Sequence, residues 1–348
     1  MFASLRSAFL GSLALSGGLA CSSGGGNPGP EPLPTPVPPR VGYSVVTVEV
    51  PATGTRIPTA VWYPTEKAES PLTYGSGQSG SILGSAALDA PAKAGNWPLL
   101  VFAHGFSGGG TGSAEITEAI ARAGYVVACP DLSDPIMCVR TTGPASGTIS
   151  QALEFLTAHP FNGTTTYDYR PKEFLGVLDA LLGRKELNID AGKVALGGHS
   201  LGGWTALSIA AGNPRVKACV LYSMGELNWY CTGMRYFEAP FFQSLGIPTI
   251  YFYGSKEQDA VAAAHSIPNG YGGWWPLVVS KFEFYSSPSP SYLLQIPGGN
   301  HFVYNSSAVA NDAAGTPQQF AAIATSTTQF LDRHLKGMNV TVIADQSK

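Results

Sequence analysis

The stretch Gly197-Gly198-His199-Ser200-Leu201-Gly202-Gly203-Trp204 (GGHSLGGW) places one serine between two pairs of glycines. It follows the apolar run VAL at residues 194–196, which is typical of a buried strand, and it leads into the helical segment WTALSIAAG. In the pattern Gly-x-Ser-x-Gly between a strand and a helix, the glycines permit a sharp turn that lifts the serine hydroxyl above the sheet. We therefore predict that Ser200 is a nucleophile at a strand-to-helix elbow.

Apolar runs and helical segments alternate on both sides of this stretch. Strands are predicted at residues 97–105, 125–131, 193–198, 216–223, 247–255 and 291–299, and helices at residues 113–123, 149–156, 172–183, 204–212 and 318–335. Continuous apolar strands separated by helices indicate an α/β fold, with a mostly parallel central sheet and helices on both faces. Two leading strands, at residues 43–50 and 55–64, have no helix between them and predict an antiparallel N-terminal edge. The Gly/Ser/Ala-rich segment 70–95 predicts a loop.

Composition limits the classes of partner. The 348 residues carry a formal net charge of −3; 12% of them are charged and 44% are hydrophobic. This balance argues against binding to nucleic acids or docking on anionic lipids through a basic face. Length and hydrophobic content suit one large domain, expected over residues 41–348. No Cys/His spacing typical of a metal site occurs, so we expect neither a metal nor a cofactor, and we expect a monomer.

Residues 1–20 have the features of a signal peptide. One cation, Arg6, precedes a mostly apolar stretch that is too short for a permanent membrane span. The segment ends just before Cys21 and resembles a bacterial lipoprotein signal, in which the cysteine is lipidated; an ordinary secretory signal cleaved at the same point is the alternative. Residues 21–40 form a Gly/Ser/Pro-rich linker. We therefore expect export, as an outer-membrane or cell-envelope lipoprotein or as a secreted protein.

A serine hydroxyl attacks efficiently only when a base accepts its proton, so a histidine is required. In elbow-containing hydrolases the acid and then the histidine follow the serine, on loops after later strands. Three of the six histidines precede Ser200, with His199 inside the elbow and expected to point elsewhere. His265 follows its strand too closely, and His334 lies in the terminal helix. His301, in the loop GGNHF after the strand at residues 291–299, is the predicted base.

The acid is expected in the loop Ser255-Lys256-Glu257-Gln258-Asp259, which follows the strand IPTIYFYG. Glu257 lies three residues after the end of that strand and is the first choice, because this is the usual spacing. Asp259 is the alternative, since it is the commoner residue type and either carboxylate can orient an imidazole.

An oxyanion hole needs two backbone N–H groups aimed at the developing negative charge. Leu201, which directly follows the serine, is expected to supply one of them. The other is expected from Phe106, in the loop His104-Gly105-Phe106-Ser107-Gly108 after the strand at residues 97–105. His104 is expected to have a structural role within that loop.

Together these motifs resemble the serine hydrolases of the α/β-hydrolase superfamily, in particular its dienelactone-hydrolase-like and platelet-activating-factor-acetylhydrolase-like branch, which borders the bacterial cutinases and polyester hydrolases. The resemblance spans residues 97–302, through WPLLVFAHGFSGGG, GYVVACPD, YRPKEFLGVLDALLG, VALGGHSLGGWTAL, NPRVKACV, IPTIYFYGS and LLQIPGGNHF. It implies an α/β-hydrolase fold and hydrolysis of carboxylic esters through an acyl-enzyme. Two departures stand out: the acid loop has Glu where the family usually has Asp, and serine replaces the cysteine of dienelactone chemistry.

Aromatic residues in later segments are candidates for lining the substrate pocket. The largest are Trp229, Trp274 and Trp275, which alternatively pack a small cap over the sheet. An apolar pocket suits small-molecule or polymeric esters with apolar acyl or aromatic groups, as in esterases, lipases and cutinases. A phospholipid deacylase and a hydrolase-fold protein that only binds are the alternatives.

Four cysteines lie in the expected domain. Cys129 and Cys219 fall within or at the ends of apolar strands, where a buried thiol is ordinary. Cys138 and Cys231 lie in irregular segments of an exported chain, which favours a bridge between these two.

Overall fold

The computed structural model describes residues 39–77, 80–159, 167–224, 239–256, 282–307 and 314–348. Its strands form one sheet in the order β12-β11-β10-β9-β8-β5-β6-β2-β1-β4-β3-β7. The centre of the sheet is parallel and consists of β6 (Val126–Pro130), β5 (Trp97–Ala103), β8 (Ile189–His199), β9 (Val216–Tyr222), β10 (Thr249–Gly254) and β11 (Ser291–Ile296). Apart from the first five residues of β8, these strands are mostly buried on both faces, as their continuous apolar sequences predict.

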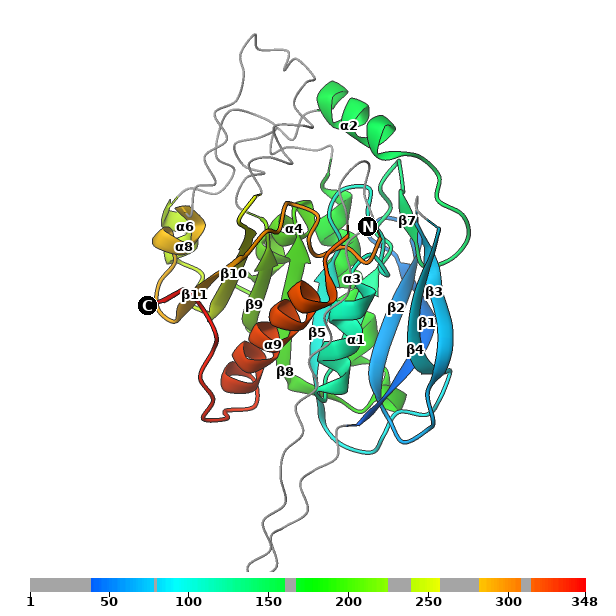
Figure 1. Cartoon of the computed structure of the whole chain (residues 1–348), viewed down its shortest axis with the longest axis horizontal. Helices are drawn as coiled ribbons and strands as arrows, with labels where there is room; N and C mark the ends of the chain where they lie inside the picture. Colours follow the sequence, from blue (N-terminus) through cyan, green and yellow to red (C-terminus); the bar gives the residue numbers. More distant parts are fainter. Residues whose placement is uncertain (1–38, 78–79, 160–166, 225–238, 257–281, 308–313) are drawn as a thin grey trace, which may run out of the picture. The chain divides into compact units, whose positions relative to one another are not determined.

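The N-terminal edge of the sheet is mainly antiparallel. β1 (Arg40–Val50) and β2 (Thr55–Thr65) pair along their whole length, and β2 joins the centre of the sheet antiparallel to β6. At the opposite edge, β12 (Gln346–Ser347) pairs antiparallel with β11. The predicted fold class, with its antiparallel N-terminal edge, is confirmed (Figure 1).

The predicted loop at residues 70–95 is wrong. This segment contains the hairpin of β3 (Ser70–Gly77) and β4 (Gly80–Leu88). In the sheet, β3 also pairs with β7 (Val139–Arg140) from a later part of the chain. Most of its residues are small, but Tyr74 is buried and packs against Tyr43 and Trp62 of β1 and β2. Tyr74, together with the pairing of β4 with β1, therefore attaches to the sheet a hairpin whose Gly/Ser-rich sequence predicts a loop.

Helices cover both faces of the sheet. α1 (Ala114–Arg122) and α9 (Pro317–His334) contact each other on one face, as Figure 1 shows. The expected apolar side of α9 is buried there, including Phe320, Ile323, Phe330 and Leu331. The other face carries α3 (Tyr169–Leu182), α4 (Leu201–Ala210), α6 (Ala239–Gln243) and α8 (Phe282–Ser286).

Two short elements complete the described part of the chain. α2 (Ile149–Ala158) begins at Thr148, whose hydroxyl accepts the Gln151 N–H while the Gln151 side chain accepts the Thr148 N–H. A single 3₁₀ turn, η1, spans Lys185–Leu187. None of the helices in the described ranges is long and apolar enough to cross a membrane.

Candidate active site

The elbow has the geometry that its glycines predict. β8 ends at His199, α4 begins at Leu201, and Ser200 between them has φ 54° and ψ −123°. Non-glycine residues rarely adopt such a backbone conformation, and those that do are concentrated at functional sites. A Cβ on Gly198 would lie 2.2 Å from the Gly202 carbonyl, and a Cβ on Gly202 would lie 2.0 Å from the Ala103 carbonyl. Both positions therefore exclude any side chain.

The outer pair of glycines permits close packing around the elbow. A Cβ on Gly197 would lie 2.7 Å from the Val220 carbonyl on β9, and one on Gly203 would lie 2.4 Å from Cγ of Met224. All four glycines of the stretch are thus required by the approach of neighbouring atoms.

The structure brings the predicted base to the predicted nucleophile. His301 lies in the loop that follows β11, and its Nε2 is 3.0 Å from the Ser200 hydroxyl oxygen. This is hydrogen-bonding distance for proton transfer from serine to imidazole. The two residues are 101 positions apart, and they meet because the carboxyl ends of parallel strands share one edge of the sheet.

As expected, His199 does not point at the Ser200 hydroxyl; it lies next to His301. Its Nε2 donates to the His301 carbonyl at 2.8 Å, and the two imidazole rings are 4.9 Å apart between centroids. Burial lowers the pKa of His199 well below its usual value, and His301 lowers it further, so His199 is neutral. From the sequence, the alternation of side chains along β8 predicts only that His199 faces away from Ser200. The contact of His199 with the His301 loop depends on tertiary packing and could not be predicted.

The two predicted oxyanion donors belong to segments that lie next to the serine. Leu201 is the first residue of α4, so its N–H has no partner within the helix. The loop after β5 approaches from the other side, and a Cβ on Gly105 would lie 3.2 Å from the Ser200 Cβ. Phe106 follows Gly105 directly in this loop.

Aromatic side chains surround the Phe106 end of the site. The ring of Phe106 stacks on Phe155 of α2, with 5.8 Å between centroids, and meets the buried ring of Tyr167 edge-on. Phe155 also stacks on His159 at 4.2 Å. Phe106 and Phe155 are only partly buried, so they present an apolar aromatic surface next to the oxyanion loop.

Several predicted residues lie outside the described ranges. They are the two candidate acids Glu257 and Asp259, the tryptophans Trp229, Trp274 and Trp275, and the cysteines Cys21 and Cys231. Among the described cysteines, the predicted bridge from Cys138 is contradicted, because Cys138 is a buried free thiol whose sulfur lies 2.7 Å from the Ser107 hydroxyl. Cys129 and Cys219 are buried free thiols, as expected.

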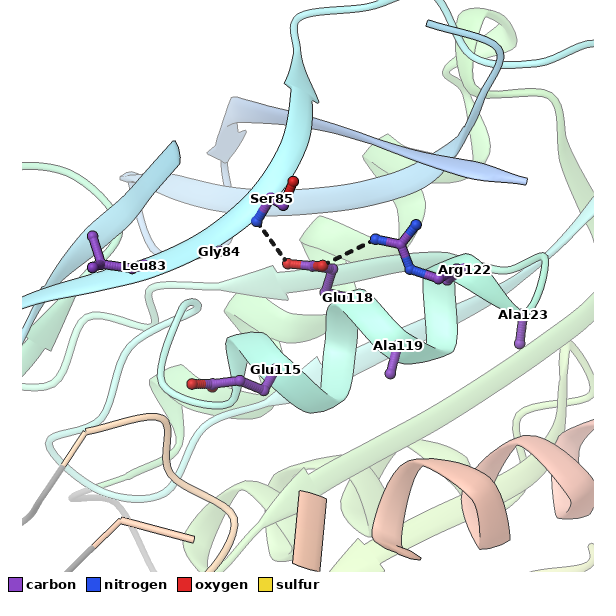
Figure 2. A pocket seen from close by; sticks show the side chains of 8 residues that line it. All are labelled: Leu83, Gly84, Ser85, Glu115, Glu118, Ala119, Arg122 and Ala123. Carbon is purple, nitrogen blue, oxygen red and sulfur yellow. Dashed lines mark hydrogen bonds and ion pairs between the residues drawn. The ribbon is translucent and has the colours of Figure 1, made fainter. Parts of the chain in front are cut away.

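A groove of about 630 Å³ lies away from the serine, between β4 and α1 (Figure 2). Glu118 at its centre accepts from the Ser85 N–H at 3.2 Å and from Arg122 at 3.1 Å, as the figure shows, and Arg122 also pairs with Glu69 at 2.6 Å. These charges stabilise the β3–β4 hairpin against α1. Within the described ranges, no three histidine, cysteine or carboxylate side chains are grouped to hold a metal ion.

Comparisons with known proteins agree with this architecture. In structure the chain is similar to a ferulic acid esterase from Streptomyces cinnamoneus, with a TM-score of 0.61 and 18% identity, over 90% of this chain and 94% of that chain. A likeness at this identity shows the fold. The model of the alpha/beta hydrolase family matches residues 100–275, more than half of the 348 and including both the oxyanion loop and the elbow. The chain therefore belongs to the alpha/beta hydrolase family.

Proposed function

We propose that this protein is a serine hydrolase that cleaves carboxylic esters through an acyl-enzyme. The observation that supports the proposal most directly is the 3.0 Å contact between His301 Nε2 and the hydroxyl of a serine in a strained elbow. A strained, glycine-framed serine beside an imidazole is the arrangement that activates a hydroxyl for nucleophilic attack.

The proposed reaction has two half-reactions. Ser200 Oγ attacks the ester carbonyl while His301 takes the hydroxyl proton, and the N–H groups of Leu201 and Phe106 stabilise the oxyanion. His301 then gives its proton to the departing alcohol, which leaves Ser200 acylated. A water molecule, deprotonated by His301, attacks the acyl group. His301 then returns this proton to Ser200 Oγ as the bond to the acyl group breaks and the carboxylic acid leaves. Glu257, or alternatively Asp259, orients the imidazole and stabilises its charged form.

We propose esters with apolar acyl or aromatic groups as the substrate class. The partly exposed rings of Phe106 and Phe155 beside the oxyanion loop support this choice, because such surfaces bind apolar groups without desolvating charge. The similar solved structure is an esterase named for ferulic acid, which is an aromatic acid. Both small-molecule and polymeric esters can carry such apolar acyl or aromatic groups.

For its location, we propose export with a lipid anchor at Cys21. The apolar segment before Cys21 and the Gly/Ser/Pro linker after it support this proposal. The linker would hold the domain away from the membrane while leaving the serine accessible to esters outside the cell.

The test of the proposed activity is a panel of nitrophenyl and aromatic-acid esters, graded by chain length, with a phospholipid carrying a short second acyl chain. We expect hydrolysis of the apolar and aromatic esters, and a loss of at least about 10⁴-fold in kcat for Ser200→Ala. Ser208→Ala is the matched control, because Ser208 lies on the same helix and its hydroxyl donates to the Trp204 carbonyl one turn earlier. Preference for the phospholipid would reassign the substrate class, and a folded but inactive wild type would make this a binding protein.

A further inference from the structure

A pair of buried charges lies next to the oxyanion loop. Arg170 on α3 is fully buried, and its Nε is 3.3 Å from Oδ1 of Asp134, whose side chain is also inaccessible. Removing two charges from water is costly unless further hydrogen bonds satisfy them. The groups that these two side chains bind therefore show what the pair holds in place.

The guanidinium of Arg170 binds the backbone of the loop. Its Nη2 donates to the His104 carbonyl at 2.7 Å and lies 3.4 Å from the Gly105 carbonyl. The imidazole of His104 binds the same Gly105 carbonyl through Nδ1 at 2.6 Å. Its Nε2 accepts the Leu132 N–H at 2.9 Å, so in the neutral ring Nδ1 carries the proton and is the donor. Burial, and then the charge of Arg170, lower the pKa of His104 and keep the ring neutral.

The position of the Gly105 carbonyl determines the direction of the Phe106 N–H. The two groups belong to one peptide unit, and the cis peptide within the described ranges is at Ser289–Pro290, so this unit is trans. In a trans peptide the C=O and N–H bonds point in opposite directions. Because the carbonyl points toward His104 and Arg170, the Phe106 N–H points away from them.

Asp134 holds the next peptide of the same turn. Its Oδ2 accepts the Ser107 N–H at 2.7 Å, and its Oδ1 accepts the Tyr169 hydroxyl at 2.7 Å. Ser107 has φ 66°, a left-handed conformation that is unfavourable for serine, so this turn needs external support. The Arg170–Asp134 pair thus holds the peptides on both sides of Phe106.

We propose that His104 and Arg170 are positioning residues that aim the Phe106 N–H at the oxyanion by fixing the Gly105 carbonyl. The inference rests on the proposed ester hydrolysis and identifies what prepares one of its two oxyanion donors. Neither residue touches the substrate: each acts through the peptide that it holds.

The first test compares two amides at position 104. The side-chain amide of His104→Asn lies near the place of Nδ1 and retains the donor to Gly105, whereas His104→Gln retains only the acceptor for Leu132. We expect kcat on a nitrophenyl ester to be roughly 10-fold or more lower in His104→Gln than in His104→Asn, with similar KM, because loss of one oxyanion donor costs about 10²–10³-fold. A trifluoromethyl ketone, which forms a tetrahedral oxyanion with the serine, should lose affinity in the same order.

Arg170→Lys provides an independent variant if a position-104 variant does not fold. Lysine keeps a positive charge but has one terminal nitrogen, which cannot take the place of both Nε beside Asp134 and Nη2 at the His104 and Gly105 carbonyls. We expect a loss of about 10-fold or more in kcat, with KM unchanged. Arg215→Lys is the matched control, since Arg215 pairs with Asp179 at the surface at 2.6 Å, and it should retain full activity.

The outcomes separate this inference from the proposed function. Equal kcat and equal ketone affinity in His104→Gln and His104→Asn, or full activity in Arg170→Lys, would overturn the inference while ester hydrolysis by the wild type stands. A wild type that hydrolyses no ester would overturn the proposed function and this inference with it.

Discussion

Ser200 is held in a backbone conformation that costs about 1–3 kcal/mol. Its own N–H donates to the Tyr222 carbonyl at 2.9 Å, and its carbonyl accepts the Gly203 N–H at 2.9 Å. The first bond ties the serine to the end of β9 and the second to the first turn of α4. Both neighbouring elements therefore hold the strained backbone of Ser200 in place.

The acid is the residue of the site for which the sequence leaves two choices. We expect Glu257→Gln to lower kcat by roughly 10³–10⁴-fold, because the imidazole loses the carboxylate that orients and stabilises it. Asp259→Asn serves as the comparison and should change kcat far less. Steady-state kinetics on one nitrophenyl ester suffice, and the reverse order of the two variants would assign the role to Asp259.

At the scale of elements, the elbow depends on the close approach of β5, β8 and α4. Gly202 on α4 faces the Ala103 carbonyl at the end of β5, so any Cβ there meets backbone that cannot rotate away. The approach of these elements places the oxyanion loop beside the serine.

We expect Gly202→Ala to lower the free energy of unfolding by roughly 3 kcal/mol, because the added methyl forces the helix away from the strand. Gly183→Ala is the matched control: Gly183 ends α3 with φ −80°, and its nearest contact to an added Cβ is an ordinary 3.4 Å. Urea denaturation of both variants measures the difference. Equal stability of the two would show that the elbow has room that the structure does not indicate.

The elements that the sequence predicts well are those with long apolar patterns. The central strands follow from their continuous apolar runs, because both of their faces are buried. The apolar side of α9 follows from its helical periodicity, because one side of this helix packs against the sheet. The β3–β4 hairpin does not, since Tyr74 is one of few large side chains among glycines and serines. Short β7 and β12 pair only two residues each, which is too little to leave a pattern.

At the scale of the whole molecule, the sheet gathers site residues that are far apart in sequence. Strand order and the serine-acid-histidine sequence predict Ser200 and His301, because each follows a recognisable strand. Arg170 and Asp134 could not be predicted, since charged residues in a sequence are ordinarily expected at the surface. Only the tertiary packing of α3 against the oxyanion loop shows that they are buried.

Buried histidines make the stability of the whole domain depend on pH. The pKa of His199 is held well below 6.5 in the folded state, mainly by burial, so this ring takes up a proton only on unfolding. Unfolding is therefore favoured as pH falls below about 6.5, by up to about 1.4 kcal/mol per pH unit for one such histidine. Glu173 acts in the opposite sense, because burial raises its pKa and its protonated form stabilises the fold in acid.

His199→Phe isolates the histidine contribution. We expect the free energy of unfolding of the wild type to fall more steeply between pH 6.5 and 5 than that of the variant, by about 1 kcal/mol per pH unit. Urea titrations at several pH values measure both slopes, and the contribution of Glu173 cancels in their difference. Parallel slopes would mean that His199 titrates alike in the folded and unfolded states.

The proposed anchor also concerns the whole chain. We expect the wild type to fractionate with membranes and Cys21→Ala to appear in the soluble exported fraction, because the lipid supplies the membrane affinity. Mass spectrometry of the mature N-terminus checks the modification itself. An unmodified mature N-terminus would favour ordinary secretion.

An activated nucleophile at Ser200 should react with a fluorophosphonate. Such a reagent phosphonylates a serine, with fluoride as the leaving group, only where a base and an oxyanion hole act on it, so the adduct reports the assembled site. Intact-protein and peptide mass spectrometry should find one adduct per chain, on Ser200, and none on the folded Ser200→Ala variant. A folded wild type that remains unmodified, or one modified at another residue, would show that Ser200 is not an activated nucleophile.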